Sequence, residues 1–380
     1  MAQSAGPFVQ SSNTTFESPR AFIANTVPKA RRSMAVGHTA SCSERFRILP
    51  DVNLKKLKNL PGAGKAAMPE FIPPQLATLV KEPPKGDEWL HELKFDGYRM
   101  LCHLNRGKVR FWSRNRKDWT HKFPNLGKAV KALSSQSLIL DGEVVAMDST
   151  GHTSFQKLQQ SIKSGDSGFI FQLFDLVYLE GYNLTRVPLI ERKALLAELL
   201  ESVDRRSPLR YSDHIEGKGD AFFKQACAHG IEGIVSKLAN SPYESTRSRN
   251  WLKVKCIKRQ EFVIAGYTPS EKSLPGFGSL VLGVYDQGKL MYAGRAGTGF
   301  SFQQRLDLRK KLDRLVRASS PFAVKPKDPG LRQAVWVTPQ LVGEVAFTEW
   351  TNDGSIRHPS FQGLREDKKP REVVREEPVS

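Results

Sequence analysis

Residues 92–99 read Glu-Leu-Lys-Phe-Asp-Gly-Tyr-Arg, and Lys94 is the residue in this stretch on which the interpretation of the chain depends. A lysine beside an aspartate, a glycine and an arginine is what covalent nucleotidyl transfer needs, since the amine attacks an α-phosphate and forms a phosphoramidate. An ammonium cannot attack, and with an ordinary pKa of about 10.4 only about one lysine in a thousand is neutral near pH 7. Burial and a neighbouring cation would lower the pKa. A pKa lowered by two or three units would recover roughly 3–4 kcal/mol of the ground-state cost of deprotonating the lysine. Taken alone, the string also fits a strand lysine followed by an Asp-Gly turn.

A pair of acidic side chains on a later strand predicts a metal site. Asp141 and Glu143 are two residues apart, so on a strand they point to one face. Such a pair usually marks a solvated edge, but here apolar residues flank it on both sides, and a buried carboxylate requires a cation. Mg²⁺ prefers oxygen ligands and keeps several waters, so one or two carboxylates and phosphate oxygens are sufficient. Glu143 therefore fits a Mg²⁺ ligand.

Two lysines on another strand indicate an anion site. Trp251, Lys253 and Lys255 alternate with apolar residues, which places them on one strand face. Two ammonium groups this close repel each other unless an anion lies between them, and a triphosphate is such an anion. A row of solvent-facing lysines on an edge strand is the alternative.

The order and spacing of these motifs resemble the ATP-dependent DNA ligases of the covalent nucleotidyltransferase superfamily, and most closely the ligase module of bacterial end-joining ligases. The resemblance covers about residues 68–372. It rests on the stretch around Lys94 and on five later motifs, namely Leu140-Asp141-Gly142-Glu143, Phe174-Asp175-Leu176-Val177-Tyr178, Glu232-Gly233-Ile234-Val235-Ser236-Lys237, Trp251-Leu252-Lys253-Val254-Lys255 and Arg365-Glu366-Asp367-Lys368. The pair Arg295-Ala296 departs mildly from the lysine and valine expected in this family.

The resemblance implies a role for each matched side chain. Lys94 becomes the AMP-bearing nucleophile with Asp96 beside it in the catalytic motif, and Glu232 joins Glu143 as a metal ligand. The nucleotide-binding residues are Glu92 at the adenine edge, Phe174 stacked on adenine, Arg99 at the sugar, Arg114 near the phosphates, Glu143, Lys253 and Lys255, and the terminal set Arg365, Asp367 and Lys368 that orients pyrophosphate. Arg192 also lies in a family-like run, without a clear role.

The implied activity is sealing of 5′-phosphate/3′-hydroxyl nicks or breaks in DNA through a lysyl-AMP, in repair by end joining. The implied cofactors are ATP and Mg²⁺, with Mn²⁺ as an alternative ion. We expect a monomer that binds nicked or broken duplex DNA, with a Ku-type end-binding protein as a candidate partner. An RNA ligase or an mRNA-capping guanylyltransferase shares the lysine chemistry and stays open, as does a non-enzymatic protein that bridges DNA ends.

Composition is consistent with a nucleic-acid partner. Lysine and arginine number 58 against 39 acidic residues, a net charge of +19, and such a basic balance favours a polyanion. No apolar run reaches the roughly 18 residues of a membrane span, so we expect no membrane association. The four cysteines, Cys42, Cys102, Cys227 and Cys256, form no Cys-x-x-Cys pair, which argues against structural zinc and predicts free thiols in a reducing compartment.

The chain divides into three parts by pattern. Residues 1–67 predict a disordered basic tail or linker, because they are rich in small and polar residues. Interleaved strands and helices over residues 68–257 predict an antiparallel α+β adenylation (nucleotidyltransferase) domain. Residues 258–380 predict an OB-fold, since five short strands surround one helix with a capping box at Ser301. A small β-barrel without a ligand is the alternative for this last part.

The expected location is the bacterial cytoplasm, in association with the nucleoid. The first forty residues contain one acidic residue, Glu17, beside several basic ones. That composition is also typical of an organellar transit peptide, which keeps an organelle as a minor alternative.

Overall fold

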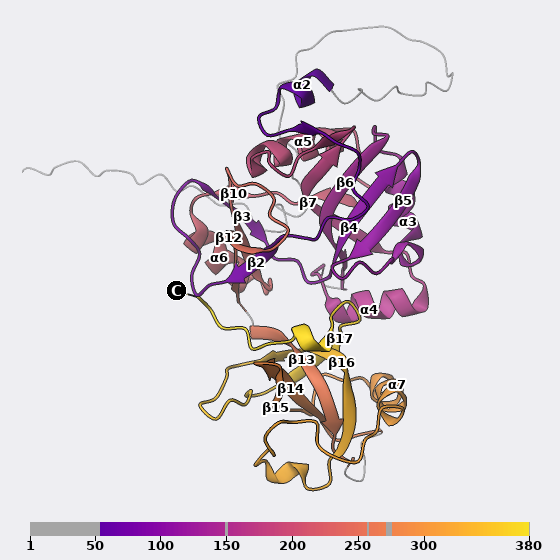
Figure 1. The fold of residues 1–380 in the computed structure, drawn as a ribbon, viewed down its shortest axis with the longest axis vertical. Coiled ribbons are helices and arrows are strands. Elements are labelled where there is room, and N and C mark those ends of the chain that lie inside the picture. Colours follow the sequence, from indigo (N-terminus) through magenta and orange to yellow (C-terminus); the bar gives the residue numbers. More distant parts are fainter. Residues whose placement is uncertain (1–53, 149–150, 257, 271–275, 380) are drawn as a thin grey trace, which may run out of the picture. The chain divides into compact units, whose positions relative to one another are not determined.

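The computed structural model describes residues 54–148, 151–256, 258–270 and 276–379, which lie in one compact unit of the chain (Figure 1). In these ranges, mostly antiparallel strands form three sheets, and helices occur between the strands along the chain. This arrangement confirms the α+β class. Two of the sheets belong to the N-terminal lobe, which we define as the described residues up to 256. The third forms the OB-fold barrel, defined as the described residues from 258 onward.

The larger sheet of the N-terminal lobe carries the main hydrophobic core. Its strand order is β1-β8-β7-β6-β4-β5, with β9 parallel to β7. The bounds are β1 Gly64–Lys65, β4 Tyr98–Asn105, β5 Lys108–Ser113, β6 Ser137–Ala146, β7 Phe169–Leu179, β8 Tyr182–Asn183 and β9 Leu209–Tyr211. The associated helices are η1 Thr120–Lys122, α3 Pro124–Lys131, α4 Phe155–Ser164 and α5 Leu189–Glu201.

A hairpin brings β4 and β5 together directly after the Lys94 stretch. Its turn consists of Arg106 and Gly107, both with positive φ (46° and 76°), as a two-residue turn between twisted strands requires. Across this hairpin Met100 faces Ser113 and Cys102 faces Phe111.

The second sheet positions Lys94. Its order is β10-β3-β11-β12-β2, with α6 Gly219–Ala228 packed beside it. The strands are β2 Leu76–Leu79, β3 Trp89–Leu93, β10 Ile215–Glu216, β11 Gly233–Leu238 and β12 Arg247–Lys255. Because β3 ends at Leu93, Lys94 is the first residue beyond the strand.

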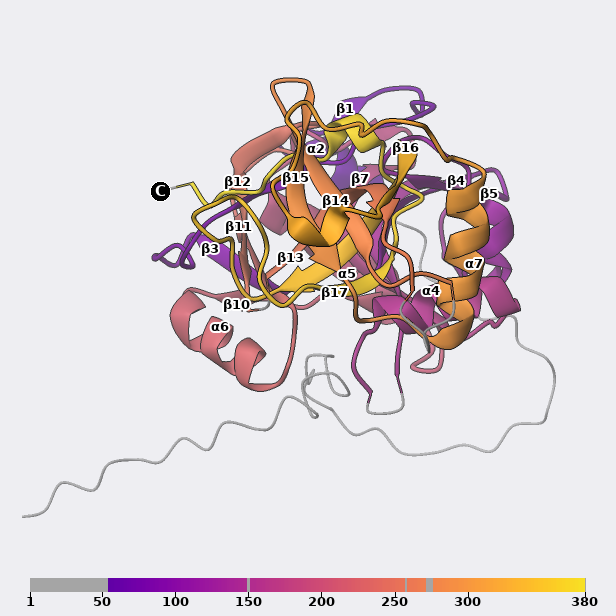
Figure 2. The ribbon, with the colours of Figure 1, turned by 90° about the horizontal axis from the view of Figure 1, so that it is seen from below.

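The barrel has the strand order β15-β14-β13-β16-β17, and Figure 2 views the molecule from the barrel side. Its elements are β13 Lys258–Tyr267, β14 Leu280–Asp286, β15 Lys289–Ala296, α7 Phe302–Asp313, η2 Pro329–Leu331, β16 Val335–Phe347, β17 Ser360–Leu364 and η3 Pro370–Glu372. A bridge between Thr298 and Ser360 joins the β15 end of the sheet to β17. The predicted capping box is present, because the Ser301 hydroxyl accepts from the Gln304 amide and the Gln304 side chain accepts from the Ser301 amide.

Part of the segment expected to be a tail packs against the lobe. Helix α2, Leu54–Asn59, contributes the fully buried Leu57 to the main core, and the Ala66 amide donates to the Gly181 carbonyl (3.0 Å). Short segments of this kind lack apolar periodicity, so the sequence did not reveal them. Residues 1–53 of the expected tail lie outside the described residues.

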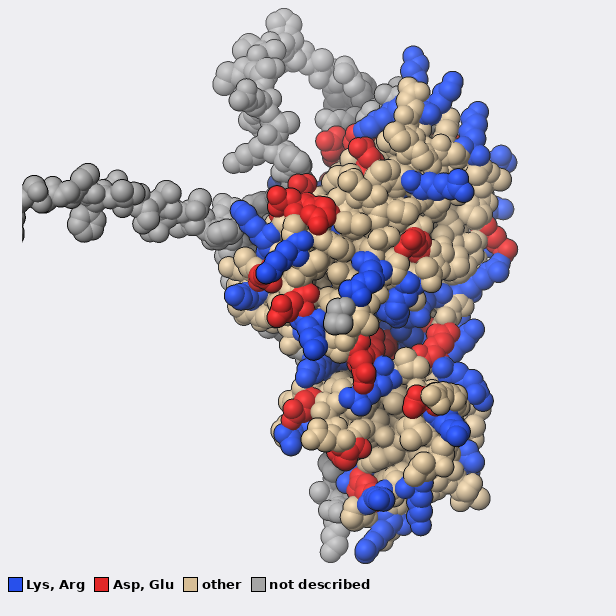
Figure 3. Space-filling view, turned by 60° about the vertical axis from the view of Figure 1, so that its left-hand side comes forward, with Lys and Arg blue, Asp and Glu red and all other residues tan. Residues whose placement is uncertain are grey.

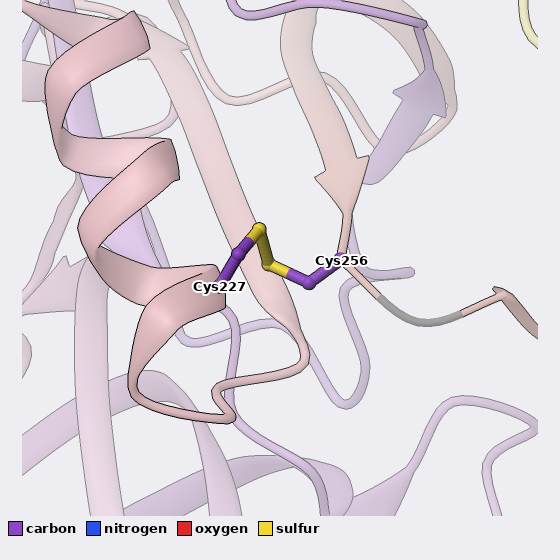
Figure 4. The surroundings of a disulfide bond; sticks show 2 residues. All are labelled: Cys227 and Cys256. Carbon is purple, nitrogen blue, oxygen red and sulfur yellow. A yellow bond between two sulfur atoms is a disulfide. The ribbon is translucent and has the colours of Figure 1, made fainter.

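The expectation of free thiols was wrong for two of the cysteines. Cys227 near the end of α6 and Cys256 just after β12 form a disulfide, with their Cα atoms 5.2 Å apart (Figure 4). The pairing depends on how α6 packs beside β11 and β12, which the spacing in sequence does not reveal. Cys102 is a buried free thiol, and Cys42 lies outside the described residues. None of the described helices has the length and apolarity of a membrane span.

Candidate nucleotide-binding pocket

Lys94 lies where β3 separates from the sheet, beside the start of β11. Its amide donates to the Gly233 carbonyl (2.9 Å), and its Nζ forms an ion pair with Glu232 Oε1 at 2.5 Å. A Cβ on Gly233 would lie 2.0 Å from the Val254 carbonyl oxygen, so only glycine allows β11 and β12 to approach this closely. The Glu-Gly pair therefore holds a carboxylate next to the lysine.

The pKa of Lys94 shifts in the direction opposite to the one predicted from sequence. Burial alone would lower it, but the Glu232 carboxylate, with Asp96 and Glu143 nearby, raises the pKa above its ordinary value. The sequence argument considered burial and cations and left out three carboxylates that the fold brings together. As it stands in this structure, Lys94 is a paired ammonium.

Glu143 is the carboxylate in the pocket that most needs a cation. Removal from water raises its pKa to about 8, although Lys94 and Arg365 oppose the shift. Among the described residues it accepts no hydrogen bond and forms no ion pair. Two carboxylates, Glu143 and Glu232, thus face the pocket beside Lys94, and the described chain contains no group of three or more acidic, histidine or cysteine ligands that could hold a metal. This donor set suits an ion that keeps water and substrate oxygens as further ligands.

Asp141 orients Arg99 from the strand next to it. The Arg99 guanidinium donates to both Asp141 oxygens, Nε to Oδ1 at 2.9 Å and Nη2 to Oδ2 at 2.5 Å. A bidentate pair of this kind fixes the plane of the guanidinium. Its central carbon lies 5.1 Å from the Phe174 ring centroid and 5.2 Å from that of Trp251. Arg99 therefore forms part of an aromatic and cationic wall.

A buried network surrounds Glu92, another residue that lines the pocket. Its Oε1 accepts from Lys193 (2.8 Å), and its Oε2 accepts from Lys237 (3.0 Å) and from the Ser212 hydroxyl (2.8 Å). Burial opposes ionisation, but the two lysines lower the pKa of Glu92 below its ordinary value. Burial also lowers the pKa of Lys237 to about 8, and its Nζ lies 4.2 Å from the Phe174 ring centroid.

Residues of the barrel complete the pocket. Arg259, at the start of β13, contacts the Asp96 carboxylate at 2.5 Å, and that carboxylate also accepts from the Phe155 amide (3.3 Å). Asn115 donates to the Asp367 carbonyl (2.5 Å) from the other side. The Lys94 motif of the N-terminal lobe is thereby connected to the barrel.

The terminal motif forms its own charge network within this wall. Arg365 donates to both Asp367 oxygens (2.9 Å each) and to Glu344 (2.7 Å), and Lys368 pairs with Glu261 (2.8 Å). Asp367 is held as a carboxylate, since Arg365 outweighs burial and lowers its pKa.

These walls enclose one cavity of about 220 Å³. Every site residue named from the sequence lines it, namely Glu92, Lys94, Asp96, Arg99, Arg114, Glu143, Phe174, Glu232, Lys253, Lys255, Arg365, Asp367 and Lys368. Lys253 and Lys255 reach it from β12, where both contact Glu376 (2.8 and 2.7 Å). Arg192 does not line it. Arg192 is fully buried and binds Asp175 through Nε (2.7 Å) and Nη2 (2.9 Å), so its role is structural.

Comparison with known proteins identifies the family. The family model "ATP dependent DNA ligase domain" matches residues 74–255, and "ATP dependent DNA ligase C terminal region" matches residues 274–368. A solved structure of mycobacterial DNA ligase D complexed with ATP and MES is 35% identical, with 80% of this chain and 98% of that chain covered and a TM-score of 0.62. The chain belongs to the ATP-dependent DNA ligase family. The resemblance inferred from the motifs and the OB-fold assignment are therefore confirmed.

Longer relatives are similar to this ligase over part of their length. The multifunctional non-homologous end joining protein LigD of Pseudomonas aeruginosa is 43% identical over 320 residues, which are 83% of this chain and 38% of that protein. The LigD of Mycobacterium tuberculosis is 37% identical over 294 residues, which are 77% of this chain and 38% of that protein. A DNA ligase of Pyrobaculum islandicum is 31% identical, and the matched region is 76% of this chain and 55% of that protein. The chain thus spans well under half the length of the LigD proteins that it matches.

Several residues of this ligase pocket were missed in the sequence. Arg259 lies outside the recognised motifs, and Lys237 ends a motif that drew attention only through Glu232. Lys193 does not line the cavity itself but binds Glu92, and it follows Arg192 in the family-like run. Lys193 lies among leucines on a helix, and a lysine in such a place could have indicated a buried partner for its charge. Glu376 follows the last motif in a charged segment and gave no indication of its position in the pocket.

Proposed function

We propose that this chain is an ATP-dependent DNA ligase that seals 5′-phosphate/3′-hydroxyl nicks or breaks through a lysyl-AMP intermediate. One observation carries the proposal most directly. A single cavity collects the Lys94 amine, two carboxylates suited to a metal ion and a lysine pair suited to phosphates. Membership of the ligase family supports the same reaction.

In the first step, the Lys94 nitrogen attacks the α-phosphorus of ATP. A nitrogen–phosphorus bond forms, the bond from the α-phosphorus to the bridging oxygen breaks, and pyrophosphate leaves. The ammonium proton must depart before attack, and Glu232 Oε1, 2.5 Å from Nζ, is the acceptor in place. AMP then passes to the 5′-phosphate of the DNA, and the 3′-hydroxyl displaces it. Positioning and charge neutralisation supply most of the catalysis.

The remaining side chains hold the nucleotide. We assign the adenine edge to Glu92, the adenine face to Phe174 and the sugar to Arg99, whose guanidinium Asp141 keeps in one plane. Lys253 and Lys255 face the β- and γ-phosphates. We assign Arg114, which also lines the pocket, to the phosphates of the nucleotide. Asp96 and Arg259 connect the two sides of the pocket, and Arg365, Asp367 and Lys368 orient pyrophosphate.

Mg²⁺ fits at Glu143 and Glu232, with Mn²⁺ as the alternative ion. The raised pKa of Glu143 reflects a carboxylate without a cation partner, which a divalent ion would relieve. A divalent ion held by Glu143 and Glu232 would supply positive charge that opposes the carboxylates raising the pKa of Lys94. Glu143 and Glu232 themselves provide the negative charge that selects a cation at this end of the pocket.

The DNA partner is proposed from charge and from the relatives. Lysine and arginine side chains are spread over both ends of the face in Figure 3. Their contacts with phosphate would give binding that weakens steeply with salt and reads little sequence. The relatives named for non-homologous end joining support a role at broken ends, with a Ku-type protein as candidate partner. We place this monomer in the bacterial cytoplasm, at the nucleoid, with the domain division at residues 68–257 and 258–380.

Incubation with α-labelled ATP tests the proposal. The wild type should become labelled and then transfer the label to a nicked duplex and seal it, whereas Lys94→Arg should not become labelled. Arginine keeps the charge next to Glu232 but does not deprotonate. Lys128→Arg, an exposed change on α3, serves as the matched control.

Three outcomes would contradict the proposal. A labelled Lys94→Arg variant would exclude Lys94 as the nucleophile. Labelling from GTP but not ATP would favour a capping-type guanylyltransferase. DNA binding by the wild type with no labelling from either nucleotide would favour a non-enzymatic end-bridging protein.

A further inference from the structure

The segment that follows the last family motif crosses from the barrel to the N-terminal lobe. Its start is tied to the barrel, since the Val373 carbonyl accepts from the Tyr285 amide (2.7 Å). Its far end is tied to β2, because the Val379 amide donates to the Leu79 carbonyl (3.0 Å). In Figure 1 this yellow segment ends beside β2. We refer to residues 373–379 as the crossing segment. It lies beyond the matched residues 274–368.

Glu376 enters the pocket from the middle of the crossing segment. Its Oε1 lies 2.8 Å from the Lys253 Nζ, and its Oε2 lies 2.7 Å from the Lys255 Nζ, so one carboxylate joins both ammonium groups. The Gln260 side chain holds the backbone in place, accepting from the Glu376 amide (3.0 Å) and donating to the Val374 carbonyl (2.9 Å). The contact is therefore anchored on both sides of the carboxylate.

Charge explains why an anion is needed at this position. Burial and the neighbouring Lys255 lower the pKa of Lys253 to about 8, despite the contact with Glu376. Burial works against the Glu376 carboxylate too, yet the two lysines lower its pKa to about 2. Two buried ammonium groups this close repel each other unless an anion lies between them, and Glu376 supplies a single negative charge there. A polyphosphate supplies more charge to the same two ammonium groups.

We propose that Glu376 occupies the place of the β- and γ-phosphates in the nucleotide-free enzyme and competes with ATP and pyrophosphate for Lys253 and Lys255. The inference rests on the proposed function, which places the leaving phosphates at this lysine pair. ATP must displace the carboxylate to bind. After pyrophosphate leaves, Glu376 returns to the lysines and offsets one of their two positive charges while AMP remains on Lys94.

This exchange acts against reversal of the first step. In the reverse reaction, a pyrophosphate oxygen attacks the α-phosphorus of lysyl-AMP, the nitrogen–phosphorus bond breaks, and ATP forms. The Lys94 nitrogen then takes up a proton. Pyrophosphate must bind the lysine pair to react, so a carboxylate that already occupies the pair reduces the rate at low pyrophosphate. Glu376 would therefore set the affinity of the phosphate site without touching the reacting atoms.

Binding of inorganic pyrophosphate to the full chain tests the inference without any chemistry. Calorimetric titration of Glu376→Gln should give a dissociation constant about tenfold lower than that of the wild type, as expected for a competitor that fills the site about nine-tenths of the time. Glutamine keeps the size and loses the charge. The matched control is Glu377→Gln, whose exposed side chain contacts Arg375, and it should bind as the wild type does. A chain that ends after Val373 should match Glu376→Gln.

Self-adenylation then separates the two proposals. Glu376→Gln should show a lower KM for ATP and faster loss of label from lysyl-AMP at low pyrophosphate. Equal pyrophosphate affinity in the wild type and Glu376→Gln, weaker binding in Glu376→Gln, or no binding to either would overturn the inference. If pyrophosphate binding tightens as expected while the wild type is never labelled by ATP, the proposed function fails and the competition at the lysine pair stands.

Discussion

Reduction of the Cys227–Cys256 disulfide should destabilise the N-terminal lobe by an amount that depends on the number of residues between the two cysteines. The cysteines are 29 residues apart in sequence, and closing a loop of this length removes conformational entropy from the unfolded chain. The loop-entropy relation gives about 3.5 kcal/mol at 25 °C for such a loop. For a chain of 380 residues, with an unfolding entropy of about 2.1 cal/mol/K per residue, the midpoint of thermal unfolding should fall by about 4–5 °C.

Scanning calorimetry with and without a phosphine reductant measures this loss. The wild type should shift to lower temperature on reduction, and the double variant Cys227→Ser with Cys256→Ser should unfold at the lower temperature under both conditions. Peptide mapping without reductant should recover Cys227 and Cys256 cross-linked. The Cys256 amide also donates to the Glu232 carbonyl (2.9 Å), so self-adenylation at 25 °C should survive reduction, because this backbone bond does not depend on the sulfurs.

Two results would refute this reasoning. If the reductant leaves the wild-type transition unchanged, the bond either does not form in solution or does not constrain the unfolded chain. If the reductant shifts the double variant by the same amount as the wild type, the stabilisation comes from some other group.

Three further changes test the energetics of the lobe. Lys193→Met leaves the buried Glu92 with one lysine fewer, so urea unfolding should show a loss of about 3–5 kcal/mol, and adding Glu92→Gln should recover part of it. Gly97→Ala would place a Cβ 2.2 Å from the Val144 carbonyl oxygen, so the free energy of unfolding should fall by about 1–3 kcal/mol. The rate of self-adenylation should fall too, and an unchanged rate would contradict the coupling of this contact to Lys94. Burial lowers the pKa of His103 to about 4, so the unfolded chain takes up the proton first as the pH falls below about 6.5. Stability should fall by up to about 3 kcal/mol between pH 6.5 and 4, and His103→Leu should lack this part of the pH dependence.

The sequence predicted the components of the pocket better than their electrostatic state. Motif order identified Lys94, Glu143, Glu232 and the lysine pair. Glu143 and the two lysines lie on strands, where alternation decides which face they join, and Lys94 and Glu232 lie directly beside the ends of strands. The pKa of Lys94 depends on how β3, β6 and β11 bring three carboxylates together, and no local pattern contains that information. The sequence therefore placed Lys94 in the pocket but gave its pKa shift the wrong sign.

Contacts over long sequence distances account for the other differences. Lys193 is fully buried on a leucine-rich helix, where its Nζ pairs with Glu92, about a hundred positions earlier in the sequence. The disulfide and the position of Glu376 likewise depend on elements that meet only in the folded chain. Helix and strand periodicity predicts faces, whereas these pairings require the topology.

The short connection between β12 and β13 has a consequence for chimeras that join the N-terminal lobe of one ligase to the barrel of another. Lys253 and Lys255 lie at the end of β12, and β13 begins at Lys258 with Arg259 already in contact with Asp96. A genetic exchange at residue 257 would therefore cut through one continuous wall of charges rather than between two independent modules. A barrel inherited from a distant relative would have to bring its own counterparts to Arg259 and Glu376, or the acceptor's lysines and Asp96 would lose their partners. Successful chimeras should accordingly be those in which both halves of this wall come from the same parent.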